Sequence, residues 1–116
     1  SLAAIRNEIV DRFIECEVGY NFSLRIISMQ DADLVPNQEA STSKLFNSEL
    51  TQRLNLTGMK PFGLYANLWD PYDARSPMHA QFTQKHVHHI SATIAGGTSE
   101  IQRNIIATRG LGLPRG

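Results

Sequence analysis

The chain has 116 residues, 41% of them hydrophobic, and its 11 basic and 11 acidic side chains give a net charge of zero. This size allows a single domain around one core, and the apolar content excludes a disordered chain. A single cysteine excludes an internal disulfide and fits a reducing compartment. No apolar run approaches the ~20 residues of a membrane span. No Lys or Arg run supports a nucleic-acid partner.

The charge is unevenly distributed along the chain. Residues 1–58 hold eight acids and five bases, whereas residues 59–116 hold three acids and six bases. The mildly basic second half suits a ligand that carries phosphate.

Residues 2–31 contain no proline and are expected to form one long helix. The chain starts at Ser1 and enters this helical pattern almost at once, so we expect a fragment of a longer protein. Steps of three and four residues define two apolar rows on roughly opposite sides of the helix. The first row is Ile5, Ile9, Phe13, Cys16, Tyr20, Leu24 and Ile27, and the second is Val10, Ile14, Val18, Phe22, Ile26 and Met29.

Two apolar faces on one helix require two neighbours. Burying the six side chains of the second row is worth about 9–18 kcal/mol at 1.5–3 kcal/mol each, as an upper bound. The helices that follow are short and few, so a missing helix or a partner subunit is expected to cover one face. The alternative is that this chain satisfies both faces by itself.

A break at Asp31–Pro36 separates this helix from a second one at residues 37–57, in which Pro36 suits the first turn and Gly58 the C-terminal cap. Residues 59–77 follow Gly58, contain Gly63 and three prolines, and are expected to form a loop. A loop of this length is uncommon in a compact domain unless it serves a site or an interface.

A third helix is expected from Ser76-Pro77 to about Ala95, followed by a Gly96-Gly97 turn. Thr98 is a good N-cap for a fourth helix at about 99–109. The sequence therefore predicts an all-α, up-and-down helical bundle, which we expect to be incomplete in this fragment.

The Gly96-Gly97-Thr98-Ser99-Glu100 turn is the most specific local feature. Two glycines permit positive φ and a close approach of the backbone to a ligand, and the N–H groups at a helix start bind phosphate or other polar oxygens. Glu100 complements the helix dipole and is suited to accept hydrogen bonds from ribose hydroxyls. The other interpretation is a simple corner between two helices with a capping Thr98.

Other candidate residues indicate structural roles. Helical metal ligands are typically four residues apart, and the four histidines do not form such a pair with a carboxylate or Cys partner. Cys16 falls in an apolar row and is expected in the core rather than as a nucleophile. Trp69 and Tyr72 either shape a pocket or, as we prefer, anchor the long loop. The histidines are His79, His86, His88 and His89.

The end of the chain resembles the C-terminal signature of acyl-CoA dehydrogenases. Residues 93–107 read TIAGGTSEIQRNIIA and residues 109–115 read RGLGLPR. Residues 39–53, with EAS, KL, EL and QR at their family positions, look like the helix that precedes this signature. The resemblance covers residues 1–116 as the C-terminal helical domain, with the family's N-terminal helical and central β domains absent.

The resemblance implies an FAD-dependent parent enzyme of fatty acid metabolism that removes two hydrogens from the α and β carbons of an acyl-CoA thioester. An electron-transfer flavoprotein is the implied electron acceptor, and dimers or tetramers are expected to assemble through the bundle. The ending looks bacterial and cytoplasmic rather than mitochondrial.

The resemblance also implies site residues. Thr98, Ser99 and Glu100 match residues that contact FAD. The stretch Asn55–Met59 matches one that contacts FAD across a subunit boundary, so Asn55, Gly58 and Met59 are implied contacts. Ile94, Ala95 and Gly96 should lie beside the flavin and the acyl group.

Gly96 stands where several relatives place the catalytic glutamate, and glycine cannot act as a base. Other relatives supply that carboxylate from an earlier helix, which would precede Ser1. We therefore expect no catalytic residue within this fragment and no activity from the fragment alone. Two alternatives remain open, namely a stand-alone helical oligomerisation module, and a domain of a related acyl-CoA oxidase or flavin monooxygenase.

Overall fold

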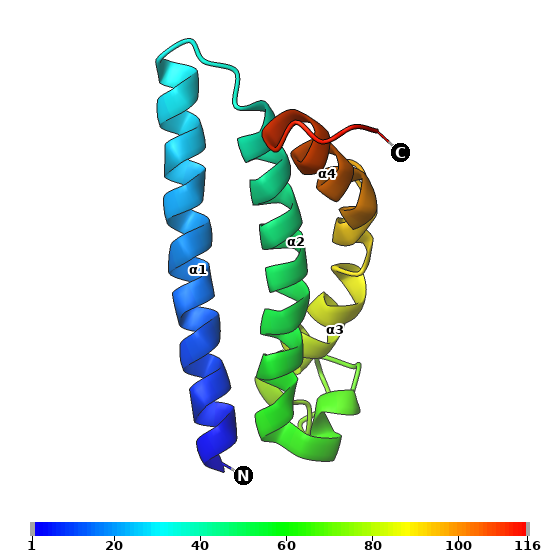
Figure 1. The fold of residues 1–116 in the computed structure, drawn as a ribbon. Coiled ribbons are helices and arrows are strands. Elements are labelled where there is room, and N and C mark those ends of the chain that lie inside the picture. Colours follow the sequence, from blue (N-terminus) through cyan, green and yellow to red (C-terminus); the bar gives the residue numbers. More distant parts are fainter. Residues whose placement is uncertain (1, 116) are drawn as a thin grey trace.

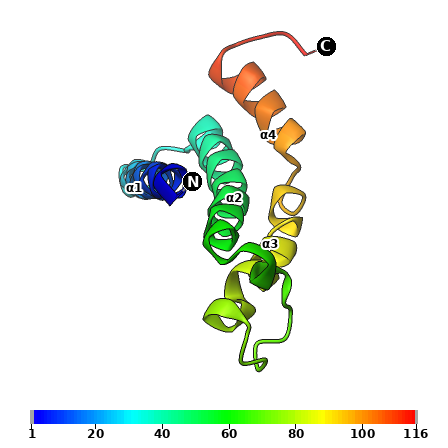
Figure 2. The same cartoon turned by 90° about the horizontal axis from the view of Figure 1, so that it is seen from below.

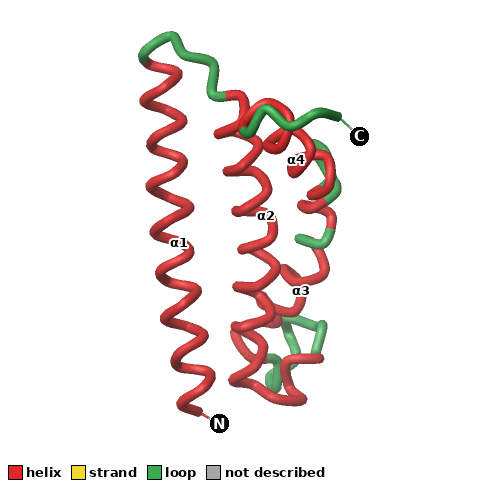
Figure 3. The backbone as a smooth tube through the Cα atoms, in the orientation of Figure 1, coloured by secondary structure: helices red, strands yellow, loops and turns green. Residues whose placement is uncertain are grey.

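A computed structural model describes residues 2–115, and every regular element among them is helical (Figures 1 and 3). This confirms the all-α prediction. The α-helices are α1 (Leu2–Asp31), α2 (Asn37–Met59), α3 (Gln81–His88) and α4 (Ser99–Ile105). The 3-10 segments are η1 (Lys60–Asn67), η2 (Pro77–Ala80) and η3 (Ser91–Thr93), and α4 continues into a π-helical turn, η4 (Ile106–Gly110).

The helices stand in a row rather than around a common centre. Seen along the bundle, α2 lies in the middle, with α1 on one side and the α3–α4 segment on the other (Figure 2). The radius of gyration is 17.3 Å, whereas a compact domain of this length has about 13 Å. Only Leu50, Ala66 and Ala80 are buried apolar residues within the described range. The helices therefore enclose little apolar core among the described residues.

The face of α1 that contacts α2 lies between the two apolar rows and is largely polar over its first half. It contains Glu8, whose carboxylate accepts from Lys60 Nζ at 2.7 Å. It also contains Glu15, whose carboxylate lies 3.2 Å from the Nη2 atom of the Arg53 guanidinium. Gly19 is buried because the α2 side chains approach it closely. The half-buried positions along this face are Ile5, Glu8, Arg12, Glu15, Phe22, Ser23, Ile26 and Met29.

Both apolar rows of α1 are therefore largely uncovered within this chain. Phe13 in the first row is 64% exposed and Val18 in the second is 52% exposed. The half-buried members of the two rows are Ile5 of the first row and the last three residues of the second row. Cys16 is exposed, so the prediction of a core cysteine was wrong. The error arose because the row that carries Cys16 faces away from α2.

The second helix ends differently from the prediction. Gly58 is helical rather than a C-terminal cap, and Lys60 ends α2 in an αR conformation that leads directly into η1. A Cβ at Gly58 would lie 2.3 Å from the Phe82 ring, so glycine is required there for close packing of α3 on α2. The expected loop at 59–77 is helical in its first half, where η1 follows α2 directly. Phe62 of η1 packs near Phe82 of α3, with ring centroids 6.4 Å apart.

The expected third helix is shorter than predicted. Residues 78–80 all have positive φ, so helix α3 begins only at Gln81, and it ends at His88. The side chain of Ser91 donates to the His88 carbonyl, and the η3 turn then leads to the glycines. Within residues 2–115, none of the helices combines the length and apolar character needed to cross a membrane.

Trp69 and its neighbours tie the remaining loop to α3. The Trp69 ring meets His88 edge to face, with centroids 6.1 Å apart, and Gln84 donates to the Trp69 carbonyl at 3.0 Å. These contacts favour the anchoring role that the sequence suggested for Trp69. Tyr72 is 93% exposed, and its ring makes no aromatic contact among residues 2–115.

Candidate functional site

The glycine turn has the backbone geometry that the sequence predicts. Gly96 and Gly97 have φ of +67° and +94°, a region that L-residues with a side chain rarely adopt. Thr98 follows in an extended conformation, and its hydroxyl accepts from the Ile101 N–H at 3.3 Å as the N-cap of α4. The turn thus connects the η3 segment to the start of α4.

Two side chains from outside the turn fix its carbonyl groups. Gln102, which is 6% exposed, donates its amide to the Gly96 carbonyl at 2.9 Å. Lys44 of α2 reaches across and donates to the Gly97 carbonyl at 2.5 Å. A Cβ on Gly97 would lie 2.7 Å from the Gln102 amide nitrogen, so a side chain here would displace the amide that binds the Gly96 carbonyl.

Glu100 lies in the first turn of α4 as an exposed carboxylate. Hydrogen bonds from its own backbone N–H and from Thr98, together with the charge of Arg103, hold the pKa of Glu100 below its ordinary value. The carboxyl is therefore ionised at neutral pH, and it is suited to accept hydrogen bonds rather than to transfer protons. Its neighbour Ser99 is buried.

A polar groove of about 450 Å³ lies beside the turn, between α2, α3 and α4. Arg103 pairs with Glu49 at 2.7 Å across this groove, and Gln52 donates to the Thr93 hydroxyl at 3.1 Å. The buried Nδ1 of His86 has no hydrogen-bond partner within the described residues. The lining consists of Glu49, Gln52, Arg53, Leu56, His86, Thr93, Ser99, Glu100 and Arg103. Guanidinium, amide and hydroxyl donors of this kind suit a ligand rich in oxygen atoms.

Residues 94–96 form an exposed approach to the turn. Ile94 is 61% exposed, and Ala95 and Gly96 are exposed as well. A Cβ at Gly96 would meet only the Lys44 Cε, at 4.0 Å. A side chain at this position is therefore opposed by the positive φ and not by a lack of space.

The structure does not bring Asn55, Gly58 and Met59 to the glycine turn. Lys44, which contacts the turn, lies 14 residues before Gly58 on the same helix, a separation of about 21 Å at 1.5 Å per residue. Asn55 is 3% exposed and donates to the Thr51 carbonyl, and Gly58 packs on Phe82. Within this chain Leu56 lines the groove together with Ser99 and Glu100, whereas Asn55, Gly58 and Met59 are not among its lining residues.

The histidines contact different parts of the chain. His79 Nδ1 lies 3.1 Å from the Pro71 carbonyl and His89 Nδ1 lies 2.7 Å from the Lys85 carbonyl, while His88 contacts Trp69. Across residues 2–115, no three His, Cys, Asp or Glu side chains gather into a potential metal site.

Sequence reasoning missed three residues that organise the site: Lys44, Gln52 and Gln102. Gln102 donates to a carbonyl that lies six residues earlier in the chain. The signal for it in the sequence was a glutamine four residues after the N-cap Thr98. Lys44 and Gln52 lie eight residues apart on α2 and contact Gly97 and Thr93. Their partners are about 40–50 residues away in sequence, so no local pattern indicated these contacts.

Comparison with known proteins assigns the chain to a family. A model described as "Acyl-CoA dehydrogenase, C-terminal domain" matches residues 1–111. A search of curated protein sequences finds no match.

Solved structures share the fold. The Tcur3481-Tcur3483 steroid ACAD superposes with a TM-score of 0.89 at 21% identity, over 97% of this chain and 29% of that one. Its G363A variant gives 0.87 at 22% identity, again over 97% and 29% of the two chains. The ChsE4-ChsE5 complex from Mycobacterium tuberculosis gives 0.86 at 26% identity, over 97% and 28%. The chain thus spans less than a third of the proteins it matches. On the family match over residues 1–111, the chain belongs to the acyl-CoA dehydrogenase family, as a C-terminal domain.

Proposed function

We propose that this domain forms one wall of the FAD site in a longer acyl-CoA dehydrogenase, which removes hydrogens from the α and β carbons of an acyl-CoA thioester. The observation that carries the proposal is the glycine turn, whose two positive-φ residues are held by Gln102 and Lys44 beside a polar groove. Family membership supports the same assignment.

The residues at the turn fit part of such a cofactor. FAD carries two phosphates, a ribose and a ribityl chain, and the groove offers guanidinium, amide and hydroxyl donors with the Glu100 carboxylate as an acceptor. The groove volume of about 450 Å³ accommodates a portion of a dinucleotide, so the remaining contacts would come from outside this chain. In the proposed reaction the cofactor supplies the hydride acceptor.

The proton acceptor is expected outside residues 1–116. Gly96 has no side chain, and the ionised Glu100 is held by hydrogen bonds at the start of α4. We therefore propose that this domain positions cofactor and substrate, with Ile94, Ala95 and Gly96 as the exposed surface toward them. The domain alone is expected to be inactive.

The exposed rows of α1 support an assembly role for the same domain. These rows, with Phe13 of the first at 64% and Val18 of the second at 52% exposure, are suited to packing against another helix of the bundle or a second subunit. We propose a homo-oligomer assembled through these rows, with Asn55, Gly58 and Met59 serving a cofactor held across the subunit boundary. We further propose a bacterial cytoplasmic enzyme that passes electrons to an electron-transfer flavoprotein.

The test compares two glutamines in the full-length protein, because each donates its side-chain amide to a backbone carbonyl. Gln102→Ala removes the bond to Gly96, and Gln84→Ala removes the matched bond to Trp69 in the anchored loop. Flavin content and the FAD dissociation constant are measured by absorbance and fluorescence. We expect Gln102→Ala to weaken FAD binding by about tenfold or more, which corresponds to roughly 1.4 kcal/mol, and Gln84→Ala to leave it unchanged.

The same preparations are then mixed with acyl-CoA thioesters in the absence of oxygen, and bleaching of the flavin absorbance is followed. The panel contains linear acyl chains and a steroid side-chain thioester, since the matched structures include enzymes named for steroids. A full-length protein that binds no FAD would overturn the proposal and favour the oligomerisation module. Rapid oxygen consumption during turnover would instead favour an oxidase or monooxygenase.

A further inference from the structure

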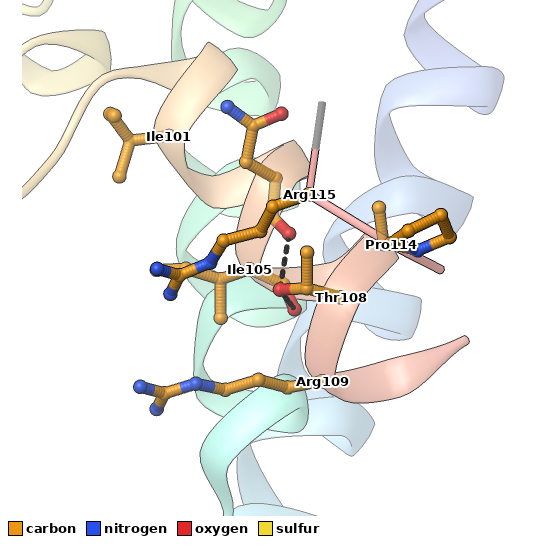
Figure 4. A pocket seen from close by; sticks show the side chains of 8 residues that line it. Ile101, Ile105, Thr108, Arg109, Pro114 and Arg115 are labelled. Carbon is orange, nitrogen blue, oxygen red and sulfur yellow. Dashed lines mark hydrogen bonds between the residues drawn. The ribbon is translucent and has the colours of Figure 1, made fainter. Parts of the chain in front are cut away.

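A second cavity lies on the side of α4 opposite to the polar groove. It has a volume of about 470 Å³ and forms where the tail after η4 folds back toward the helix (Figure 4). Gly112, with φ of +67°, reverses the chain, and the Leu113 N–H donates to the Ala107 carbonyl at 3.0 Å. The lining residues are Ile101, Asn104, Ile105, Ala107, Thr108, Arg109, Pro114 and Arg115.

The cavity is positively charged. Arg109 and Arg115 line it and no Asp or Glu does. Arg109 donates to the neutral Asn37 side chain at 2.8 Å, and neither arginine belongs to an ion pair among residues 2–115. In the close-up both guanidinium groups extend toward the same side of the cavity (Figure 4). Two like charges facing one space favour an anion between them.

The rest of the lining is apolar and shaped by the tail. Ile101, Ile105 and Pro114 surround the space, and Ile101 is 49% exposed although it lies within a helix. The Thr108 hydroxyl donates to the Asn104 carbonyl at 2.8 Å, so its oxygen remains an acceptor toward the cavity. A bare inorganic ion would fill only a small part of a cavity of this volume.

We propose that this cavity binds an organic phosphate ester, with the phosphate between Arg109 and Arg115 and an apolar group against Ile101, Ile105 and Pro114. A phosphate monoester carries up to two negative charges near neutral pH, which matches two guanidinium groups, and its oxygens accept bidentate hydrogen bonds from each. The site is separate from the proposed FAD contact, because Ser99, Glu100 and Arg103 face the groove on the other side of α4.

The experiment titrates full-length protein that is saturated with FAD, so that phosphate sites of the cofactor are already filled. Calorimetry compares phenyl phosphate, inorganic phosphate and benzyl alcohol as probes. We expect phenyl phosphate to bind at least tenfold more tightly than inorganic phosphate, and benzyl alcohol to give no saturable signal. A crystal soaked with phenyl phosphate should show the phosphate between the two arginines.

Arg115→Gln is the decisive variant, because Arg115 makes no hydrogen bond or ion pair within the described residues and its loss should leave the fold intact. The matched control is Arg6→Gln, which removes an exposed arginine from α1. We expect Arg115→Gln to weaken phenyl phosphate binding by about tenfold or more, as removing one charge-assisted partner does, and Arg6→Gln to have no effect. Equal affinity in both variants, equal affinity for inorganic phosphate, or no saturable binding would each overturn the proposal.

Discussion

The two long helices of this domain have similar lengths and opposite surroundings. Helix α2 contacts α1, α3, α4 and the turns between them, so its side chains are buried or half-buried on almost every side. Helix α1 contacts α2 along one strip that is largely polar in its first half, and most residues of the apolar rows on either side of that strip are exposed. The comparison shows that α1 carries apolar surface for a further neighbour, which we propose to be another helix of the bundle or a second subunit.

The largest effect is expected on subunit assembly, from changes in the two exposed apolar rows of α1. Phe13→Asp combined with Val18→Asp places two charges where a partner helix is proposed, and an unpaired buried charge costs several kcal/mol. In the full-length protein we expect the oligomer to dissociate, measured as molar mass by light scattering. Lys85→Asp, an exposed change on α3, is the control. An unchanged mass for the double variant would contradict the proposed subunit contact.

Glycine substitutions compare the packing of the two helices directly. Gly58→Ala on α2 places a Cβ 2.3 Å from the Phe82 ring, and we expect the free energy of unfolding to fall by about 1–3 kcal/mol. Gly19→Ala on α1 meets the end of the flexible Asn47 side chain. Its gain in helix propensity of about 1 kcal/mol should largely offset that contact. Urea unfolding of both variants measures the difference, and equal losses would show that α1 and α2 are packed alike.

A smaller effect is expected where α4 meets α2. Thr98→Ala removes the N-cap hydrogen bond to the Ile101 N–H and should destabilise α4 by about 1 kcal/mol, whereas Thr98→Ser retains the hydroxyl. Amide hydrogen exchange of α4 should accelerate in Thr98→Ala alone. If the serine variant exchanged equally fast, the hydroxyl would not be the stabilising group.

The smallest effect is expected in the loop between η1 and η2, which contains Asp73. Hydrogen bonds from the Arg75 side chain and backbone lower the pKa of Asp73 to about 2. Because the folded pKa lies below the ordinary value of 3.8, the stabilisation is complete above about pH 4 and is lost as the pH falls toward 2. A carboxyl titration by NMR should show this midpoint, and Arg75→Gln should return it toward the ordinary value. A midpoint that does not move would exclude the pairing with Arg75.

Local patterns determined the helices that have strong signals of their own. The proline-free run predicted both ends of α1, at Leu2 and Asp31, and Pro36 marked the start of α2. Thr98 and the two glycines predicted the turn and the start of α4, because N-caps and positive φ depend on the residues at those positions themselves. Gly58 and Cys16 were misjudged, since the space around Phe82 and the direction of the α1 rows depend on distant segments.

The sequence by itself therefore determined the helical class, the family signature and the geometry of the glycine turn. Only the tertiary structure decided which face of α1 meets α2, which side chains hold the turn, and where Arg109 and Arg115 come together. The physical reason is that helix periodicity fixes which residues share a face, whereas contacts between residues about 50 apart depend on how the helices pack.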